Sequence, residues 1–285
     1  MKIYELLNIG TNLLGKRSDA PLIAEVLLAY VIGKEKEYLI GHTEEDVSEE
    51  DGVLFLNYIS RARNGEPLSY ITQEKEFFGI DFFVDKRVLI PRPETEMLVI
   101  KALEFIGQEK YVGSGVRILD IGTGSGNIAI SLAKNLQDKF EYEIDAIDIS
   151  SDAIDVASVN VTQHGVEFAV NLILSDLLEE IEEESFYDVI VSNLTYIGEK
   201  INDFVEENVK KFEPDSALFA GDDGLALYEK LFKQINEKNI KFKILIGEIG
   251  DEQEDQIKEL VIKYFGIVPV IERDLSGLPR MFYLC

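Results

Sequence analysis

Apolar residues recur at helical spacing through the first sixty residues of the chain. Three stretches show this pattern, at residues 3–7, 23–30 and 54–59, where apolar side chains are three or four positions apart. Two acidic runs, at residues 44–46 and 49–51, predict a solvated loop followed by the start of a helix. Together these patterns predict a small helical region at the amino terminus.

A strand-like pattern replaces the helical one from residue 67 to residue 84. The sequence FFGIDFF, which begins at Phe77, places a pair of aromatic residues on each side of Gly79. Aromatic runs that flank a glycine are typical of two strands joined by a tight turn, so we predict a β-hairpin here. We expect this hairpin to connect two domains.

Helical and strand-like segments alternate through the rest of the chain. A helix after Pro93 is predicted to bury Leu98, Ala102 and Phe105 on one face. Seven strand candidates follow, at residues 117–120, 143–147, 170–174, 187–191, 242–247, 267–271 and 280–284. Alternation at this spacing is typical of α/β proteins, so we predict a doubly wound, mainly parallel sheet covered by helices on both faces.

Charge and cysteine content narrow the class of protein. The chain has 28 Lys and Arg against 54 Asp and Glu, and the net charge of −26 repels DNA, RNA and anionic membranes at long range. Its only cysteine is Cys285, so no intrachain disulfide and no cysteine-based zinc site can form. No apolar run reaches the roughly 18 residues that span a bilayer, and nothing at the amino terminus marks export. We therefore expect a cytoplasmic protein without membrane or non-specific nucleic-acid binding.

A glycine-rich turn provides the first candidate for ligand binding. It follows the strand predicted at residues 117–120, precedes a helix that begins near Asn127, and consists of Gly122, Thr123, Gly124, Ser125 and Gly126. Glycines let the backbone approach a ligand closely, and the helix start offers unpaired N–H groups. In a parallel sheet this is the edge where ligands bind. From these residues alone, a plain connection between strand and helix remains the alternative.

Two further positions on the same edge suggest a nucleoside. Asp148 ends the strand at residues 143–147, where a carboxylate can accept hydrogen bonds from both hydroxyls of a ribose. Leu177 follows the next strand and could pack on the face of an adenine. Taken alone, Asp148 is better interpreted as a capping residue, and the residues around Leu177 fit a helix cap as well as an adenine contact. The glycine turn upstream makes nucleoside binding the better interpretation.

Polar and aromatic residues after the fourth strand indicate which chemistry the nucleoside serves. Asn193, Leu194, Thr195 and Tyr196 follow the strand at residues 187–191. At this point the sequence resembles S-adenosylmethionine-dependent methyltransferases that modify planar nitrogens and carry the signature Asn-Pro-Pro-Tyr. Asn193 and Tyr196 match that signature, whereas Leu194 and Thr195 stand in place of its two prolines.

Other segments narrow the resemblance to the protein-(glutamine-N5) methyltransferases that act on peptide chain release factors. The matching segments cover nearly the whole chain and read GEPLSYI from Gly65, VLIPRPETE from Val88, FEP from Phe212, ALFAGDDGL from Ala217 and GEIG from Gly247. Among them IPRPETE is highly specific for the family.

The resemblance implies a fold and a domain organisation. The fold would be a seven-stranded methyltransferase sheet whose last strand runs antiparallel, inserted beside its neighbour. The chain would comprise a helical substrate-recognition domain at residues 1–66, a β-hairpin linker at residues 67–90, and a methyltransferase domain at residues 91–285.

The resemblance also implies a reaction. S-adenosylmethionine would lie on the glycine turn with Asp148 on its ribose and Leu177 near its adenine, and the substrate would be the glutamine of the GGQ motif of a release factor. Asn193 and the carbonyl of Leu194 would accept the two N–H bonds of the glutamine amide, and Tyr196 would form an aromatic wall beside it. No metal would be required.

Two alternatives remain open at this point. The same arrangement of Asn193 and Tyr196 could orient the N6 amino group of an adenine in a nucleic acid, although the charge of −26 opposes this. The absence of both loop prolines could also leave a cofactor-binding protein with weak or lost catalysis, because proline fixes the backbone of such a loop.

Overall fold

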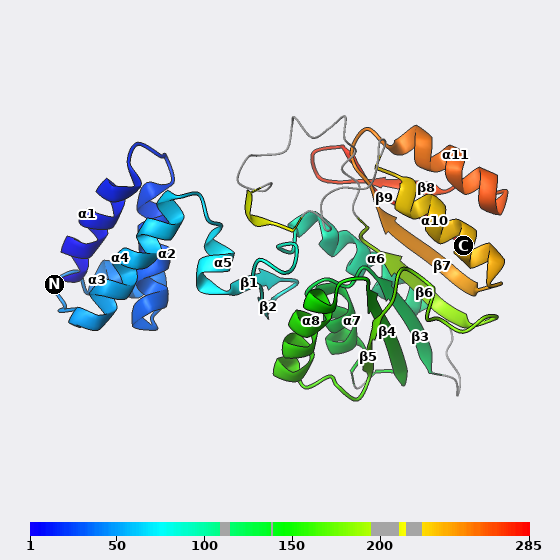
Figure 1. Ribbon diagram of the computed structural model, residues 1–285, viewed down its shortest axis with the longest axis horizontal. Coiled ribbons are helices and arrows are strands. Elements are labelled where there is room, and N and C mark those ends of the chain that lie inside the picture. The colour runs from blue at the N-terminus through cyan, green and yellow to red at the C-terminus, as the bar shows by residue number, and fades with distance from the viewer. Residues whose placement is uncertain (109–114, 138, 195–210, 215–223) are drawn as a thin grey trace. The chain divides into compact units, whose positions relative to one another are not determined.

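The chain forms two compact units in a computed structural model, which describes residues 1–108, 115–137, 139–194, 211–214 and 224–285 (Figure 1). One unit contains Met1–Glu74 together with Glu207–Phe212, and the other contains Lys75–Glu206 together with Glu213–Cys285. No helix within the described ranges has the length and apolar character that crossing a bilayer requires.

The first unit is helical, as the sequence predicts. Its elements are α1 (Ile3–Leu14), α2 (Ala20–Ile32), α3 (Lys36–Gly41), α4 (Glu49–Arg63) and α5 (Leu68–Thr72). The acidic run at residues 49–51 forms the first turn of α4, where Ser48 caps the helix by accepting a hydrogen bond from the Asp51 N–H at 3.0 Å. The core of this unit buries Phe55 and Ile59 of α4. The helical pattern at residues 54–59 predicts an apolar face with Leu54, Leu56 and Ile59, but Leu54 is exposed, so that face is wrong at its first position.

The predicted hairpin is confirmed, but it is shorter than expected. Strands β1 (Glu74–Phe77) and β2 (Ile80–Phe83) pair, and both turn residues between them, Phe78 and Gly79, have positive φ angles of 54° and 73°. The strand-like pattern from residue 67 was wrong for α5, which is a short helix. Tertiary packing decides this, because a helix there lets Ile71 join the core of the first unit.

The second unit contains the predicted seven-stranded, mainly parallel sheet, in the order β5-β4-β3-β6-β7-β9-β8. Its strands are β3 (Val116–Ile121), β4 (Tyr142–Asp148), β5 (Val170–Leu174), β6 (Phe186–Ser192), β7 (Lys241–Glu248), β8 (Val270–Arg273) and β9 (Pro279–Leu284). Strand β9 is antiparallel to both β7 and β8 and lies between them, which confirms its expected insertion. Strand β8 begins at Val270 and not at residue 267, because the chain needs Gly266 and the next residues to turn out of the preceding helix.

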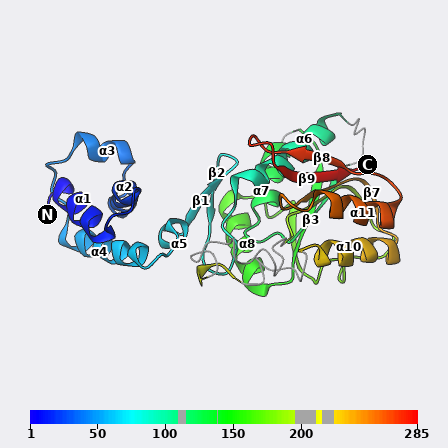
Figure 2. The same ribbon diagram turned by 90° about the horizontal axis from the view of Figure 1, so that it is seen from above.

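Helices cover both faces of this sheet. They are η1 (Pro93–Thr95), α6 (Glu96–Gln108), α7 (Asn127–Leu136), α8 (Ser151–His164), α10 (Ala226–Glu237) and α11 (Glu254–Phe265). Helices α6, α7 and α8 contact one another in sequence, and α6 lies on the opposite side of the sheet from α10 and α11 (Figure 2). On α6 the core receives Leu98, Ala102 and Ile106, whereas Phe105 is only partly buried, so the predicted face is wrong at its last position.

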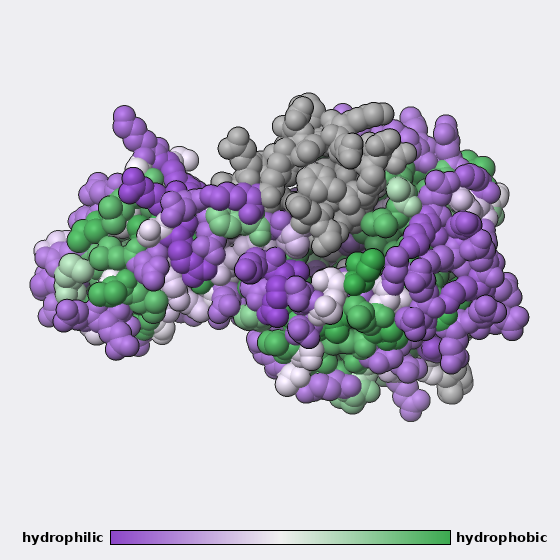
Figure 3. Space-filling model, viewed as in Figure 1, coloured by the Kyte–Doolittle hydropathy of each residue, from purple (hydrophilic) through white to green (hydrophobic). Residues whose placement is uncertain are grey.

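The outer surfaces of α10 and α11 are hydrophilic, and purple residues cover much of that side in the space-filling view (Figure 3). The inner face of α10 buries Tyr228, Leu231 and Phe232 in the core of the second unit. These helices therefore have the amphipathic character expected of a layer that covers a sheet.

Candidate active site

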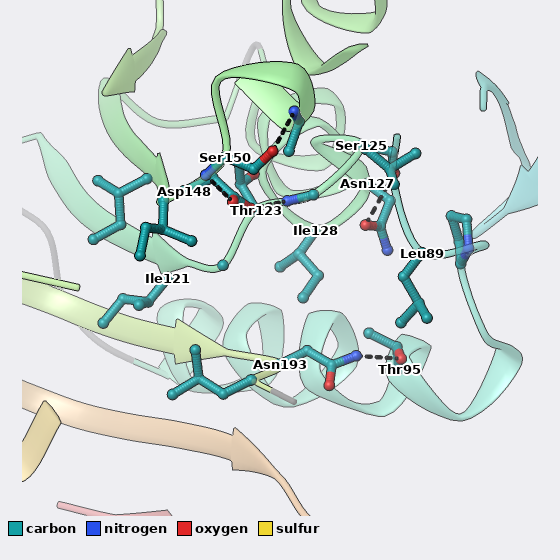
Figure 4. Close-up of a pocket in the computed structure, with 18 of the residues that line it drawn as sticks. Leu89, Thr95, Ile121, Thr123, Ser125, Asn127, Ile128, Asp148, Ser150 and Asn193 are labelled. Carbon is teal, nitrogen blue, oxygen red and sulfur yellow. Dashed lines mark hydrogen bonds between the residues drawn. The ribbon is translucent and has the colours of Figure 1, made fainter. Parts of the chain in front are cut away.

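A pocket opens at the carboxyl ends of β3, β4 and β6, within the second unit (Figure 4). Of the residues singled out from the sequence, it is lined by Gly122, Thr123, Gly124, Ser125, Asp148, Leu177, Asn193 and Leu194. Gly126 is not among the lining residues, and Thr195 and Tyr196 lie outside the described residues. The structure thus brings together eight positions that the sequence spreads over 73 residues, from 122 to 194.

The glycine turn has a backbone conformation that would be strained in residues other than glycine. Gly122, Gly124 and Gly126 have φ angles of 77°, 54° and 81°, in the left-handed region that favours glycine. The N–H groups of Gly122 and Thr123 both donate to the carbonyl of Ile147 in β4 at 2.9 Å, which ties the turn to the neighbouring strand. Gly126 is the N-cap residue of α7, so its role in the described structure is to shape the turn into that helix.

Asp148, the last residue of β4, forms a hydrogen bond with the same turn. Its Oδ2 accepts the N–H of Gly124 and its Oδ1 accepts the N–H of Ser150, each at 2.9 Å. Burial raises the pKa of the Asp148 carboxyl. Because each carboxylate oxygen has two lone pairs, both oxygens retain the capacity to accept one further hydrogen bond.

Asp120 lies beneath the turn and is completely buried. The Thr123 hydroxyl donates to its Oδ2 at 2.8 Å and the Ala129 N–H donates to the same oxygen at 3.3 Å. Its Oδ1 has no hydrogen-bond partner in the part of the chain that the structure describes. Burial without full pairing favours the neutral acid and raises the pKa of Asp120 to about 7.

Leu177 supplies an apolar wall of the pocket from an unusual backbone conformation. Its φ angle is 52°, which is uncommon for a residue other than glycine. The Ser175 hydroxyl donates to the Leu177 carbonyl at 2.7 Å and accepts the Glu180 N–H at 3.1 Å. These two bonds hold the strained backbone, so the side chain of Leu177 is kept at the pocket.

Asn193 stands immediately after β6 and its carboxamide is held from the side of α6. Its Nδ2 donates to the Thr95 hydroxyl at 3.0 Å, and that hydroxyl donates to Oε2 of Glu248 at 2.7 Å (Figure 4 shows the first of these bonds). Thr95 and Glu248 are buried, with 1% and 2% of their surfaces exposed. Below them, the Tyr228 hydroxyl donates to the Glu248 carbonyl at 2.7 Å and lies 3.3 Å from the Ser192 carbonyl.

Leu194 is anchored by its side chain. It is 6% exposed and belongs to the apolar core of the second unit. A Cβ atom added at Gly122 would lie 3.4 Å from Leu194 Cδ2, which shows how closely this side chain approaches the glycine turn. Packing therefore restrains the residue that occupies the first proline position of the related signature.

Four residues at or beside the pocket had no role assigned from the sequence. They are Thr95, Glu248, Arg92 and Glu213. Arg92 lines the pocket and donates to Oε1 of buried Glu213 at 2.6 Å, and Glu213 also accepts the Ile90 N–H at 3.3 Å. All four lie in the segments IPRPETE, FEP and GEIG. These motifs supported the family resemblance, and their presence could have marked the four residues as candidates for the site.

The fold agrees with comparisons to known proteins. A family model described as "Methyltransferase domain" matches residues 113–261, and one described as "PrmC N-terminal domain" matches residues 5–72. The crystal structure of the human METTL16 catalytic domain in complex with a MAT2A 3′UTR hairpin has a similar fold, with a TM-score of 0.58, 16% identity and 90% coverage of each chain. The METTL16 N-terminal domain in complex with SAH gives a TM-score of 0.51 with 16% identity over 90% of this chain and 92% of that one. Fold and site together define an S-adenosylmethionine-dependent methyltransferase.

Sequence relatives identify the family. The release factor glutamine methyltransferase of Koribacter versatilis is 38% identical over 93% of this chain and 91% of its own length. That of Clostridium acetobutylicum is 36% identical over 99% of this chain and 97% of its own length. The chain belongs to the release factor glutamine methyltransferase family, and the resemblance found from its motifs is confirmed.

Proposed function

We propose that this protein transfers a methyl group from S-adenosylmethionine to the side-chain amide nitrogen of the GGQ glutamine of a peptide chain release factor. The observation that carries the proposal is the Asn193 carboxamide, which borders the pocket at the end of β6 with its Nδ2 bonded to Thr95. Its Oδ1 has no hydrogen-bond partner among the described residues and is suited to accept an amide N–H. Family membership supports the same reaction.

The pocket residues fit the cofactor. Asp148 has acceptor capacity left on both oxygens for the two ribose hydroxyls, and its bonds to Gly124 and Ser150 hold it in place. A Cβ at Gly124 would meet nothing within 4 Å, so the turn leaves space beside the backbone. Leu177 offers an apolar surface for an adenine. When bound, S-adenosylmethionine supplies an electrophilic methyl group on a sulfonium.

The residues after β6 would activate a poor nucleophile by orienting it. An amide nitrogen reacts slowly because its lone pair is delocalised into the carbonyl. In the proposed complex Asn193 Oδ1 accepts one N–H of the glutamine amide and the Leu194 carbonyl accepts the other. These contacts align the nitrogen and stabilise the positive charge that develops on it, which is catalysis by orientation and electrostatics. Tyr196, outside the described residues, would flank the planar amide.

The proposal extends to the organisation of the chain. The helical residues 1–66 would recognise the release factor, and residues 91–285 would carry out the reaction. Residues 67–90 would link these two domains. Release factors act in translation, so the reaction would take place in the cytoplasm. The match of residues 5–72 to an N-terminal domain model supports a separate module at this end.

The two alternatives receive less support. Modification of adenine in a nucleic acid would require an acceptor polyanion to approach a protein with a net charge of −26. A binding protein without catalysis would follow from a loosened loop, but Leu194 is held at the first proline position by burial in the core. Methylation of a glutamine therefore remains the function that the site supports best.

Isotope transfer tests the proposal directly. The purified protein is incubated with methyl-labelled S-adenosylmethionine and a release factor, and the label is mapped by mass spectrometry. Label on the GGQ glutamine is expected, and none on a matched release factor in which that glutamine is replaced by alanine. Label in nucleic acid alone, or cofactor binding without any transfer to the release factor, would contradict the proposal.

A further inference from the structure

The Asn193 carboxamide is held by side chains that come from two distant segments of the chain. Thr95, the last residue of η1, is 98 positions before Asn193, and Glu248, the last residue of β7, is 153 positions after Thr95. Both partners are buried, and the bonds of 3.0 Å and 2.7 Å connect them into a relay from Asn193 through Thr95 to Glu248. In Figure 4 the Asn193 side chain points to Thr95 at the floor of the pocket.

The donors and acceptors in this relay fix its direction. A carboxylate only accepts hydrogen bonds, so Glu248 takes the single hydroxyl proton of Thr95. The Thr95 oxygen is left with lone pairs, and it can serve Asn193 only as an acceptor. Asn193 must therefore present Nδ2 to Thr95, and its Oδ1 points away from Thr95. The flipped carboxamide would bring two acceptor oxygens together.

The end of β7 is itself fixed, so the relay has a rigid anchor. The Tyr228 hydroxyl bonds to the Glu248 carbonyl at 2.7 Å and lies 3.3 Å from the carbonyl of Ser192, the residue before Asn193. A Cβ at neighbouring Gly247 would lie 2.8 Å from the same hydroxyl, so only glycine fits beneath it. The strand ends that carry Asn193 and Glu248 are thus tied to one side chain.

We infer that Thr95 and Glu248 are positioning residues, which hold Asn193 with its oxygen toward the acceptor and thereby select a substrate group that donates N–H bonds. The inference rests on the proposed function and deepens it. In this inference the relay lets the site distinguish two kinds of substrate group. A primary amide offers two N–H donors and is accepted, whereas a group with only acceptor oxygens is not. Without the relay the carboxamide would rotate, and half of its orientations would present an NH₂ group to the substrate NH₂.

Removal of the Thr95 hydroxyl tests the relay. Thr95→Val keeps the shape of the side chain and cannot accept from Asn193, so the single-turnover methylation rate should fall about ten- to a hundredfold, the loss typical of a reacting group misplaced by up to about 1 Å. Thr95→Ser restores the hydroxyl and should return the rate to within about threefold of the parent, since hydrogen bonding is regained. The affinity for S-adenosylmethionine, measured by calorimetry, should stay within about twofold in both variants because Asp148 and the glycine turn are untouched.

A second variant and a matched control separate positioning from folding. Glu248→Gln keeps an acceptor oxygen for Thr95 and should lose less activity than Glu248→Leu, which has none. Thr72→Val removes a buried hydroxyl that bonds only to backbone, at 3.1 Å from the Leu68 carbonyl, and should leave the rate unchanged. The side-chain amide resonances of Asn193, assigned in ¹⁵N spectra by their loss in Asn193→Ala, should shift in Thr95→Val and return in Thr95→Ser.

Non-additivity completes the test. In an Asn193→Ala background, Thr95→Val should not lower the single-turnover methylation rate further, because the residue through which it acts is gone. Parental methylation by Thr95→Val, an unshifted Asn193 amide, or additive losses in the double variant would overturn the inference while leaving glutamine methylation intact. A parent protein that labels no glutamine would instead overturn the proposed function.

Discussion

The two sides of the pocket are built in different ways. On the proposed cofactor side, the turn at residues 122–126 is held through its own backbone N–H groups. Those of Gly122 and Thr123 donate to the Ile147 carbonyl of β4 and that of Gly124 donates to Asp148, each at 2.9 Å. On the proposed acceptor side, the Asn193 carboxamide is held, among the described residues, by the side chain of Thr95, which in turn bonds to Glu248. Backbone groups belong to every residue, whereas a side-chain relay needs particular residues at three remote positions.

This difference predicts which property of the protein a substitution on each side of the pocket should change. The cofactor side depends on glycine backbone angles and on one carboxylate, so changes there should act on S-adenosylmethionine affinity. The acceptor side depends on the direction of one carboxamide, so changes there should act on the transfer rate. Substitutions on each side therefore test whether the two sides differ in this way.

The largest effect is expected from Asn193→Ala. Loss of the acceptor oxygen should lower the methylation rate about a hundred- to a thousandfold, as loss of one preorganised hydrogen-bonding group does in other enzymes. The dissociation constant for S-adenosylmethionine should remain within about twofold of the parent, because the lost contact is made with the acceptor. Rates from labelled methyl transfer and affinities from calorimetry measure both.

Asn236→Ala is a matched control for this variant. Asn236 lies on α10, where its Nδ2 bonds to the Tyr264 carbonyl at 3.1 Å and its side chain is remote from the pocket residues. Its removal should leave the rate unchanged. Parental activity in Asn193→Ala would eliminate the proposed mechanism.

A pH-dependent stability is expected from Asp120 on the cofactor side. Its pKa is raised to about 7 in the folded protein from 3.8, so the folded state binds a proton that the unfolded state has released between these values. The free energy of unfolding should therefore fall as pH rises, by roughly 3 kcal/mol between pH 5 and pH 8 from this group. Asp120→Asn, which stays neutral, should lack this contribution.

Urea unfolding of the parent and of Asp120→Asn at both pH values isolates the effect. Every other titrating group is common to the two proteins, so the difference between their free energies of unfolding reports Asp120. The parent should lose stability relative to the variant as pH increases. Equal pH dependence in the two proteins would show that Asp120 ionises normally when folded.

Asp148→Ala should weaken the cofactor site more moderately. The carboxylate offers two charge-assisted hydrogen bonds of about 1.5–3 kcal/mol each, and a loss of at least tenfold in S-adenosylmethionine affinity is expected once solvent takes part of their place. Asp152→Ala removes a nearby but exposed charge on α8 and serves as the control. Calorimetry that finds equal affinities in the two variants would exclude Asp148 from the cofactor site.

The smallest effect is expected from Leu194→Pro. Proline would restrict the loop and favour its ordering by about 0.4–1 kcal/mol, but it also removes part of a buried leucine side chain. These terms oppose each other, so the methylation rate should change by no more than about threefold. A large gain in rate would mean that packing does not restrain this residue in the parent.

Local sequence signals predicted most of the fold and the position of the glycine turn and Asp148 at one edge of the sheet. The helix and strand alternation, the inserted last strand, the glycine turn and Asp148 all appear where the pattern or the resemblance put them. Periodicity and turn chemistry involve residues that are close in the chain, so they can be read from it directly. The placement of Asn193 at the same edge follows from parallel pairing of β3 with β6.

Only the tertiary structure decided the features that depend on remote contacts. Helix α5 forms in a strand-like sequence because Ile71 reaches the core of the first unit. Leu194, at a proline position of the related signature, packs against the glycine turn. The relay from Asn193 to Glu248 spans separations of 98 and 153 residues. Free energy at such positions comes from burial and from hydrogen-bond partners that the fold brings together, and neither is encoded in the neighbouring residues of the chain.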